Sequence, residues 1–189
     1  MNKTALSPIY NTLDWVLAWA ARFGAVAMVA LIAITMYDVM TRYFSIPKFA
    51  GLNSTMVQES EYWAHGILFA LVMGYGLTKQ VHVRIDLLRD IMPRKVQYAM
   101  EIFGILIFLV PFAYIGTIYC YTYAVKSFVD GEVSPSTVGL TNIWLLKSTL
   151  VMMFGLLLLA GVSQFLKAVD GLLGNLSAEN EARVLGGGH

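Results

Sequence analysis

Hydrophobic residues along the chain gather into four long runs that are separated by short polar segments. The runs read "WVLAWAARFGAVAMVALIAITMY", "YWAHGILFALVMGYGLT", "IFGILIFLVPFAYIGTIYCYTYAV" and "STLVMMFGLLLLAGVSQFL". A helix needs roughly 20 apolar residues to cross the hydrocarbon core of a bilayer, because it rises 1.5 Å per residue. The pattern therefore predicts an all-α integral membrane protein with four transmembrane helices, at about 15–41, 59–80, 100–126 and 146–168.

The polar segments predict how these helices are connected. Turn-forming residues follow the first and third runs, in "SIPKFAGLNST" and "DGEVSPST". We expect one transmembrane domain over 15–169, preceded by a short N-terminus over 1–14. The remaining residues, 170–189, form a polar tail that we expect to be disordered, and its Gly-Gly-Gly-His end has the composition of a vector-derived addition.

The connection between the second and third runs has its own periodicity. Between residues 81 and 92 the apolar positions are spaced i, i+4, i+7 and i+11, at Val81, Ile85, Leu88 and Met92. The polar residues His82, Asp86 and Arg89 share another face of the same helix. This spacing predicts a short amphipathic helix at the membrane interface, which Pro93 ends.

Basic residues predict the orientation of the four helices. The side that holds both termini and the 79–101 connection carries Lys3, Lys79, Arg84, Arg89, Arg94, Lys95, Lys167 and Arg183. The opposite side carries Arg42, Lys48 and Lys126, with Lys147 close to the membrane edge. Because Lys and Arg accumulate on the cytoplasmic side of membrane proteins, we expect both termini to be cytoplasmic, an N-in/C-in topology.

Composition agrees with a membrane protein and excludes other classes. Hydrophobic residues make up 58% of the chain and charged residues 13%, with a mean hydropathy of +0.65. The net charge of +1 provides no basic field for binding nucleic acid. A single cysteine, Cys120, leaves no partner for an intramolecular disulfide or a redox pair.

A few polar residues at the ends of the runs are candidates for specific contacts. Arg42 lies four residues after Asp38, which allows an ion pair along one helix face. Glu61 lies four residues before His65, and we expect these two side chains to pair. We expect Lys147 to extend to the headgroups, the alternative being an acidic partner on another helix.

No metal or catalytic site is predicted. His82 and Asp86 have the spacing of half a metal site, but a stable site needs more ligands. The 17 positions between His65 and His82 span about 25 Å of helix, so the two histidines cannot share a metal or a haem. Small residues at Ala70 and Gly74, and at Gly155, Ala160 and Gly161, predict close helix packing instead.

Six short segments occur in the order found in a known family. They are "RY" at 42–43, "ESEYW" at 59–63, "HVRID" at 82–86, "MPRK" at 92–95, "FGILIFLVPF" at 103–112 and "GEVSPSTVGLTNIWLLKSTL" at 131–150. With them the chain resembles the small membrane subunit, of DctQ type, of tripartite ATP-independent periplasmic (TRAP) transporters, from about Asp14 to Val169. One departure is Thr141-Asn142, where relatives often have Leu-Pro before the tryptophan.

The resemblance implies a role in a sodium-driven importer of organic acids in the bacterial inner membrane. In such a system a periplasmic binding protein (DctP-type) delivers the substrate, and a large membrane subunit (DctM-type) holds the substrate and sodium sites. The small subunit would be a scaffold without catalytic residues or cofactors. Candidate contacts with the other subunits or with membrane lipids are then Arg42, Glu61, His82, Arg84, Asp86 and Lys147.

Two other classes of membrane protein remain as alternatives. A four-helix membrane redox or cofactor-binding protein would need facing histidines or a cysteine pair, which this pattern lacks. A stand-alone small exporter would need an acidic residue within the membrane, and the nearest candidate, Glu101, lies at the edge of the third run.

Overall fold

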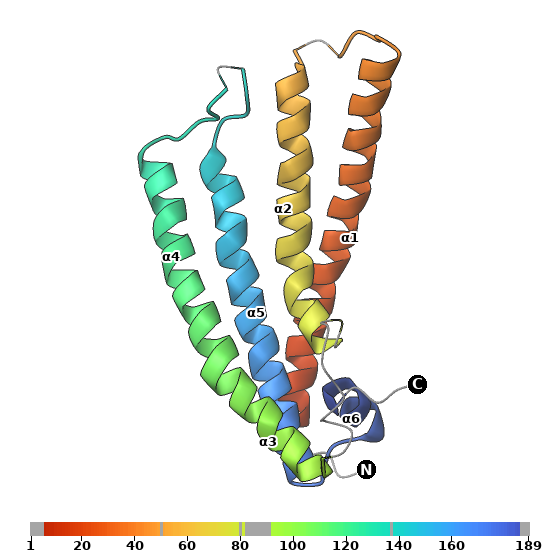
Figure 1. The fold of residues 1–189 in the computed structure, drawn as a ribbon, viewed down its shortest axis with the longest axis vertical. Coiled ribbons are helices and arrows are strands. Elements are labelled where there is room, and N and C mark those ends of the chain that lie inside the picture. Colours follow the sequence, from red (N-terminus) through yellow and green to blue (C-terminus); the bar gives the residue numbers. More distant parts are fainter. Residues whose placement is uncertain (1–5, 50, 80, 82–91, 137, 186–189) are drawn as a thin grey trace.

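The computed structural model describes residues 6–49, 51–79, 81, 92–136 and 138–185, and these residues are predominantly helical. The elements are α1 (Ser7–Tyr43), α2 (Ser54–Thr78), α3 (Arg94–Gly104), η1 (Ile105–Leu109), α4 (Val110–Val129), α5 (Ile143–Leu172) and α6 (Ala178–Leu185). Figure 1 shows that α3, η1 and α4 follow one another as a single curved rod. The described part of the chain contains no β-strand, in agreement with the predicted all-α class.

Among the described residues, three helical segments are long and apolar enough to cross a membrane. They are Ser7–Tyr43, Arg94–Val129 and Ile143–Leu172, which contain 18-residue stretches with mean hydropathies of 2.0, 2.2 and 2.1. They correspond to the first, third and fourth predicted spans. The second predicted span coincides with α2, which carries Glu59 and Glu61 and is not one of the three.

The helices extend beyond the apolar runs from which they were predicted. With 37 residues, α1 is roughly 55 Å long, whereas the hydrocarbon core is about 30 Å thick. It begins at Ser7 rather than near residue 15, and α5 continues to Leu172, past the expected domain end at 169. Hydropathy detects only the part of a helix that lies in lipid, so the polar ends of these helices were missed.

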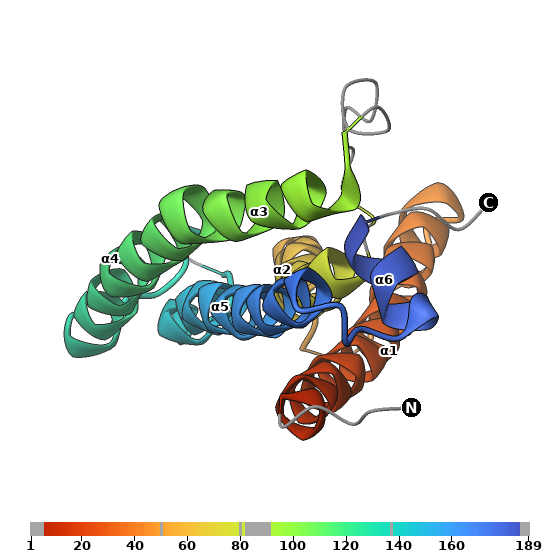
Figure 2. The same ribbon diagram turned by 90° about the horizontal axis from the view of Figure 1, so that it is seen from below.

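The long helices pack in the order α1, α2, α5, α4, with α1 and α4 at opposite edges (Figures 1 and 2). Helix α5 is central, since it contacts α1, α2, α3, α4 and α6. Both termini lie at one end of this layer, which we call the terminal end. The connections 44–53 and 130–142 lie at the other end, which we call the loop end.

Small residues bring the central helices into close contact. A Cβ atom on Gly74 of α2 would lie 2.6 Å from the backbone oxygen of Leu156 in α5. A Cβ on Gly161 of α5 would lie 2.6 Å from the side chain of Leu109. Ala70 and Ala160 are both buried. The predicted close packing is confirmed for Gly74 and Gly161 and wrong for Gly155, which has open space around it.

Pro111 changes the helical geometry in the third span. Proline has no N–H to donate to the carbonyl of Ile107, four residues earlier. One turn before it, Ile105–Leu109 forms a π-helix, and the N–H of Val110 donates to the oxygen of Ile105. The helical distortion associated with Pro111 thus takes the form of a π-turn.

Asn142 precedes α5 in a left-handed conformation, with φ +62°. Asparagine tolerates this region better than most residues, whereas proline is restricted to negative φ. The Thr141-Asn142 departure from the family pattern therefore accompanies a backbone conformation that a proline at 142 would not permit.

Part of the C-terminal tail is a helix rather than the disordered segment that we expected. Val184 of α6 is buried against Tyr98 of α3 and Ala168 of α5. Arg94 and Glu181 form an ion pair across the same contact. A short amphipathic segment can be stabilised in this way by packing, which the polar composition of the tail alone does not reveal.

Candidate functional site

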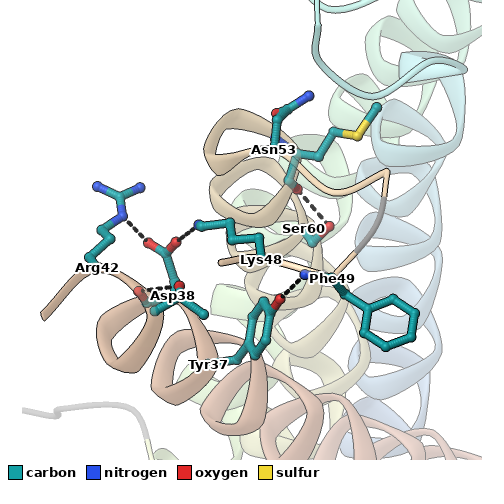
Figure 3. Close-up of polar contacts among 9 residues, drawn as sticks. Tyr37, Asp38, Arg42, Lys48, Phe49, Asn53 and Ser60 are labelled. Atoms are coloured by element: carbon teal, nitrogen blue, oxygen red, sulfur yellow. Dashed lines mark hydrogen bonds and ion pairs between the residues drawn. The ribbon is translucent and has the colours of Figure 1, made fainter. Parts of the chain in front are cut away.

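Asp38 is the centre of a charge cluster at the loop end (Figure 3). Its buried carboxylate lies 2.8 Å from Nε of Arg42 and 2.5 Å from Nζ of Lys48. Nearby, the N–H of Phe49 donates to the Tyr37 hydroxyl at 2.9 Å. The predicted Asp38–Arg42 pair is confirmed, and Lys48, which sequence reasoning missed, attaches the 44–53 connection to α1.

Glu59 attaches the second connection to α2. It is buried, with 6% of its surface exposed, and its carboxylate accepts hydrogen bonds from the Ser134 hydroxyl and the Leu140 N–H. The side chain of Asn53 donates to the backbone oxygen of Val138 at 2.8 Å. These contacts hold the 130–142 connection against the start of α2.

Lys147 is held inside the protein instead of extending to the headgroups as we expected. Its side chain is 10% exposed and pairs with Glu132, which lies in the connection and not on another helix. Its ammonium lies 3.7 Å from the centre of the Tyr123 ring. The hydrogen bond from Lys147 holds the pKa of the Glu132 carboxyl below its usual value.

The expected pair between Glu61 and His65 is wrong. Both residues are described, and no hydrogen bond or ion pair joins them; Glu61 is half-buried. His65 is exposed, with its ring 4.8 Å from that of Phe69. The carboxylate of this region that points into the protein is Glu59, two residues earlier, so the prediction chose the wrong face of the helix.

The terminal end contains a second charge cluster that sequence reasoning missed. Lys167 of α5 is completely buried, and its Nζ lies 2.6 Å from Oδ2 of Asp14 in α1. The hydroxyl of Ser163 donates to the other carboxylate oxygen of Asp14 at 2.5 Å. Asp170 is also buried and lies beside Tyr10. The available signal was the spacing of Ser163, Lys167 and Asp170, which places three polar side chains on one face of α5.

Gln164 connects the same region to α2. Its side-chain amide donates to the backbone oxygen of Leu77 at 3.3 Å. Leu77 is in the last turn of α2, where backbone oxygens have no partner within the helix. The terminal end thus joins α1, α2 and α5 through side chains of α5.

Three candidate residues, His82, Arg84 and Asp86, lie outside the described residues, as does most of the amphipathic helix predicted over 81–92. Their proposed contacts with subunits or lipids remain predictions. Among the described residues, no group of three histidine, cysteine or acidic side chains has the geometry of a metal site.

The fold and these clusters define an α-helical membrane protein with its buried charges at the two ends of the helices. A sequence model of the family described as "Tripartite ATP-independent periplasmic transporters, DctQ component" matches residues 31–171. The chain therefore belongs to the DctQ family, as its motifs indicated. Comparison with curated proteins and with solved structures gives no match.

Proposed function

We propose that this chain is the scaffold subunit of a sodium-coupled TRAP transporter that imports organic acids across the bacterial inner membrane. In this proposal α2 is a fourth span and both termini are cytoplasmic. The chain stabilises the large membrane subunit, of DctM type, which holds the substrate and sodium sites. It also helps to dock the periplasmic binding protein, of DctP type. Family membership supports the transporter class, and sodium coupling and organic acids are what the resemblance implies.

The observation that carries the scaffold role is the position of the buried charges. Asp38, Glu59 and Lys147 are buried at the loop end, and Lys167 and Asp170 are buried at the terminal end, where the half-buried Asp14 pairs with Lys167. Between these two ends, the helices pack against one another through apolar and small residues. A path for ions or carboxylates needs polar groups within the membrane, whereas a supporting wall does not.

The two edges of the layer offer wide apolar surfaces to lipid or to another protein. On α1 the exposed side chains include Phe23, Val26 and Val29, and on α4 they include Phe112, Ile115 and Tyr119. Apolar surface of this extent is expected on a helix that faces lipid or a partner within the bilayer. We propose that one edge faces the large subunit and the other faces lipid.

The candidate contact residues differ in how far their side chains are free to contact another subunit or a lipid. Arg42 keeps 45% of its side chain exposed while it pairs with Asp38, so it is a proposed contact for the binding protein at the loop end. Glu61 is a second proposed contact there. Lys147 is already engaged by Glu132 and Tyr123, and we assign it to holding the connection in place. His82, Arg84 and Asp86 are proposed contacts for lipids or the large subunit on the cytoplasmic side.

Co-purification and site-directed cross-linking test this proposal. The tagged full chain would be co-expressed with a large subunit of DctM type from the same genome, in a Cys120→Ser background that removes the chain's single cysteine. We expect the two proteins to elute together, and a cysteine at either Val29 on α1 or Ile115 on α4 to cross-link to the large subunit. Elution of the chain alone, with no cross-link from either edge, would contradict the scaffold role.

A further inference from the structure

A cavity between α1 and α2 at the terminal end is not used by the scaffold role. Its volume is about 260 Å³, and it opens beside the Asp14–Lys167 pair. The lining combines opposite charges, neutral polar groups and aromatic rings, from Asn11, Asp14, Trp15, Tyr75, Thr78 and Lys79. The lining is therefore partly polar and partly apolar, although the cavity lies among membrane helices.

The position of the cavity along α1 corresponds to the surface of the bilayer. Polar residues precede Asp14 in this helix, and an almost continuous apolar run begins at Trp15. Trp15 and Trp19 are both exposed and contact each other with ring centres 6.0 Å apart. The Arg22 guanidinium lies 4.6 Å from the Trp19 ring. Tryptophan and basic side chains in this arrangement are typical of the headgroup region.

Lys79 provides a positive charge that no acidic side chain of the described residues neutralises. It is exposed at the end of α2, with its ammonium 5.4 Å from the centre of the Tyr75 ring, and within the described residues it forms no ion pair. Asn11 is exposed across the cavity, and its amide has no hydrogen-bond partner in the described part of the chain. These two groups are donors available to a phosphate oxygen.

Asp14 provides the opposite charge in the same cavity. Its side chain is 21% exposed even though it receives one bond from Lys167 and one from Ser163. A carboxylate has about four acceptor positions, so Asp14 keeps capacity for a further donor. The Asp14–Lys167 pair is neutral as a unit, which leaves Lys79 to determine the net charge of the lining. A purely anionic ligand would therefore meet Lys79 favourably and Asp14 unfavourably.

From this arrangement we propose that the cavity binds the phosphoethanolamine headgroup of a phospholipid. The phosphate accepts hydrogen bonds from Lys79 and Asn11, and the primary ammonium donates to Asp14. Trp15 and Tyr75 flank the headgroup at the depth where the acyl chains enter the bilayer. The ligand would bridge α1 and α2 at the end opposite to the 44–53 connection.

Native mass spectrometry of the full chain in detergent tests the site. With phosphatidylethanolamine, phosphatidylcholine and phosphatidylglycerol in equal amounts, we expect one phosphatidylethanolamine to be retained preferentially, because a trimethylammonium group cannot donate N–H bonds. Lys79→Gln should lower its retention about fivefold, the loss of one charged contact at a partly exposed site. Lys79→Arg should preserve retention. The matched control is Lys126→Gln, an exposed lysine at the loop end, which should have no effect.

Soluble competitors identify which part of the lipid is recognised. Millimolar phosphoethanolamine should displace the bound lipid from the wild-type chain more effectively than inorganic phosphate does. Equal displacement by the two competitors would overturn recognition of the ammonium. Retention that is unchanged in Lys79→Gln, or that is as strong for phosphatidylglycerol as for phosphatidylethanolamine, would overturn the site itself.

Discussion

The two ends of the molecule are held together in different ways. At the terminal end the charged groups join helix to helix, since Asp14 of α1 meets Lys167 and Ser163 of α5. At the loop end they join helices to connections, since Asp38 meets Lys48, and Glu59 meets Ser134. The charged groups of the terminal end therefore fix how the helices pack, whereas those of the loop end fix the positions of the two connections between helices.

This difference follows from the surroundings of each group. Lys167 is completely buried, so its charge depends on Asp14 and its neighbours for compensation. Arg42, by contrast, is largely exposed and remains hydrated while it pairs with Asp38. Loss of a partner should consequently be costly at the terminal end and mild at the exposed positions of the loop end.

The largest effect is expected from Lys167→Met. This change leaves the Asp14 carboxylate without its buried cationic partner, which should lower the free energy of unfolding by about 3 kcal/mol. The double variant Asp14→Leu/Lys167→Met removes both charges and should recover much of that loss. Equilibrium unfolding in mixed detergent measures both values. A double variant less stable than the single one would contradict this account, because it would show that Asp14 stabilises the fold through contacts other than Lys167, such as Ser163.

A smaller effect is expected from Glu59→Ala at the loop end. The substitution leaves the Ser134 hydroxyl and the Leu140 N–H without their acceptor, at a cost of about 2 kcal/mol. Glu61→Ala is the matched control, because Glu61 is half-buried and forms none of these bonds. Unfolding midpoints of the two variants, together with protease cleavage of the 130–142 connection, measure the difference. Equal stability of the two variants would contradict the assigned role of Glu59.

Arg42→Ala should have a still smaller effect on stability. The pair with Asp38 is exposed on the arginine side, and Lys48 remains to compensate the Asp38 carboxylate. We expect a loss of about 0.5 kcal/mol in the free energy of unfolding. A loss comparable with that of Glu59→Ala would contradict this expectation, because it would show that Arg42 is needed for the stability of the fold.

The smallest effect is expected from acid titration of Glu132. Its folded-state pKa lies below the ordinary value of 4.5, so the pair with Lys147 adds stability above that pH. The contribution should disappear as the pH falls through the lower, folded-state value. Thermal unfolding between pH 6 and pH 3 should show a small decrease in midpoint that is absent in Glu132→Gln. An equal decrease in midpoint in the wild type and in Glu132→Gln would show that other carboxyl groups cause it.

The helices could largely be predicted from the sequence, because an apolar run of bilayer length can satisfy its backbone hydrogen bonds in lipid by forming a helix. Their ends could not, since the polar first turns of α1 and the last turns of α5 lie outside the apolar runs. The helix α6 was missed for a related reason. It is stabilised by the packing of Val184 on Tyr98 and Ala168, a contact between segments far apart in the chain.

The polar clusters were predictable only where both partners lie on one helix. Asp38 and Arg42 are four residues apart, so helix geometry alone brings them together. Asp14 and Lys167 are brought together by the packing of α1 on α5, which no local pattern specifies. The choice of Glu61 over Glu59 failed because the buried face of α2 depends on the position of the 130–142 connection.

The scaffold role is tested most directly by uptake into proteoliposomes. The full chain would be reconstituted alone, with the large subunit, and with both the large subunit and the binding protein loaded with its organic acid, under an inward sodium gradient. Our account predicts that the acid accumulates only in vesicles that contain all three proteins. Sodium-driven accumulation by this chain alone would contradict it.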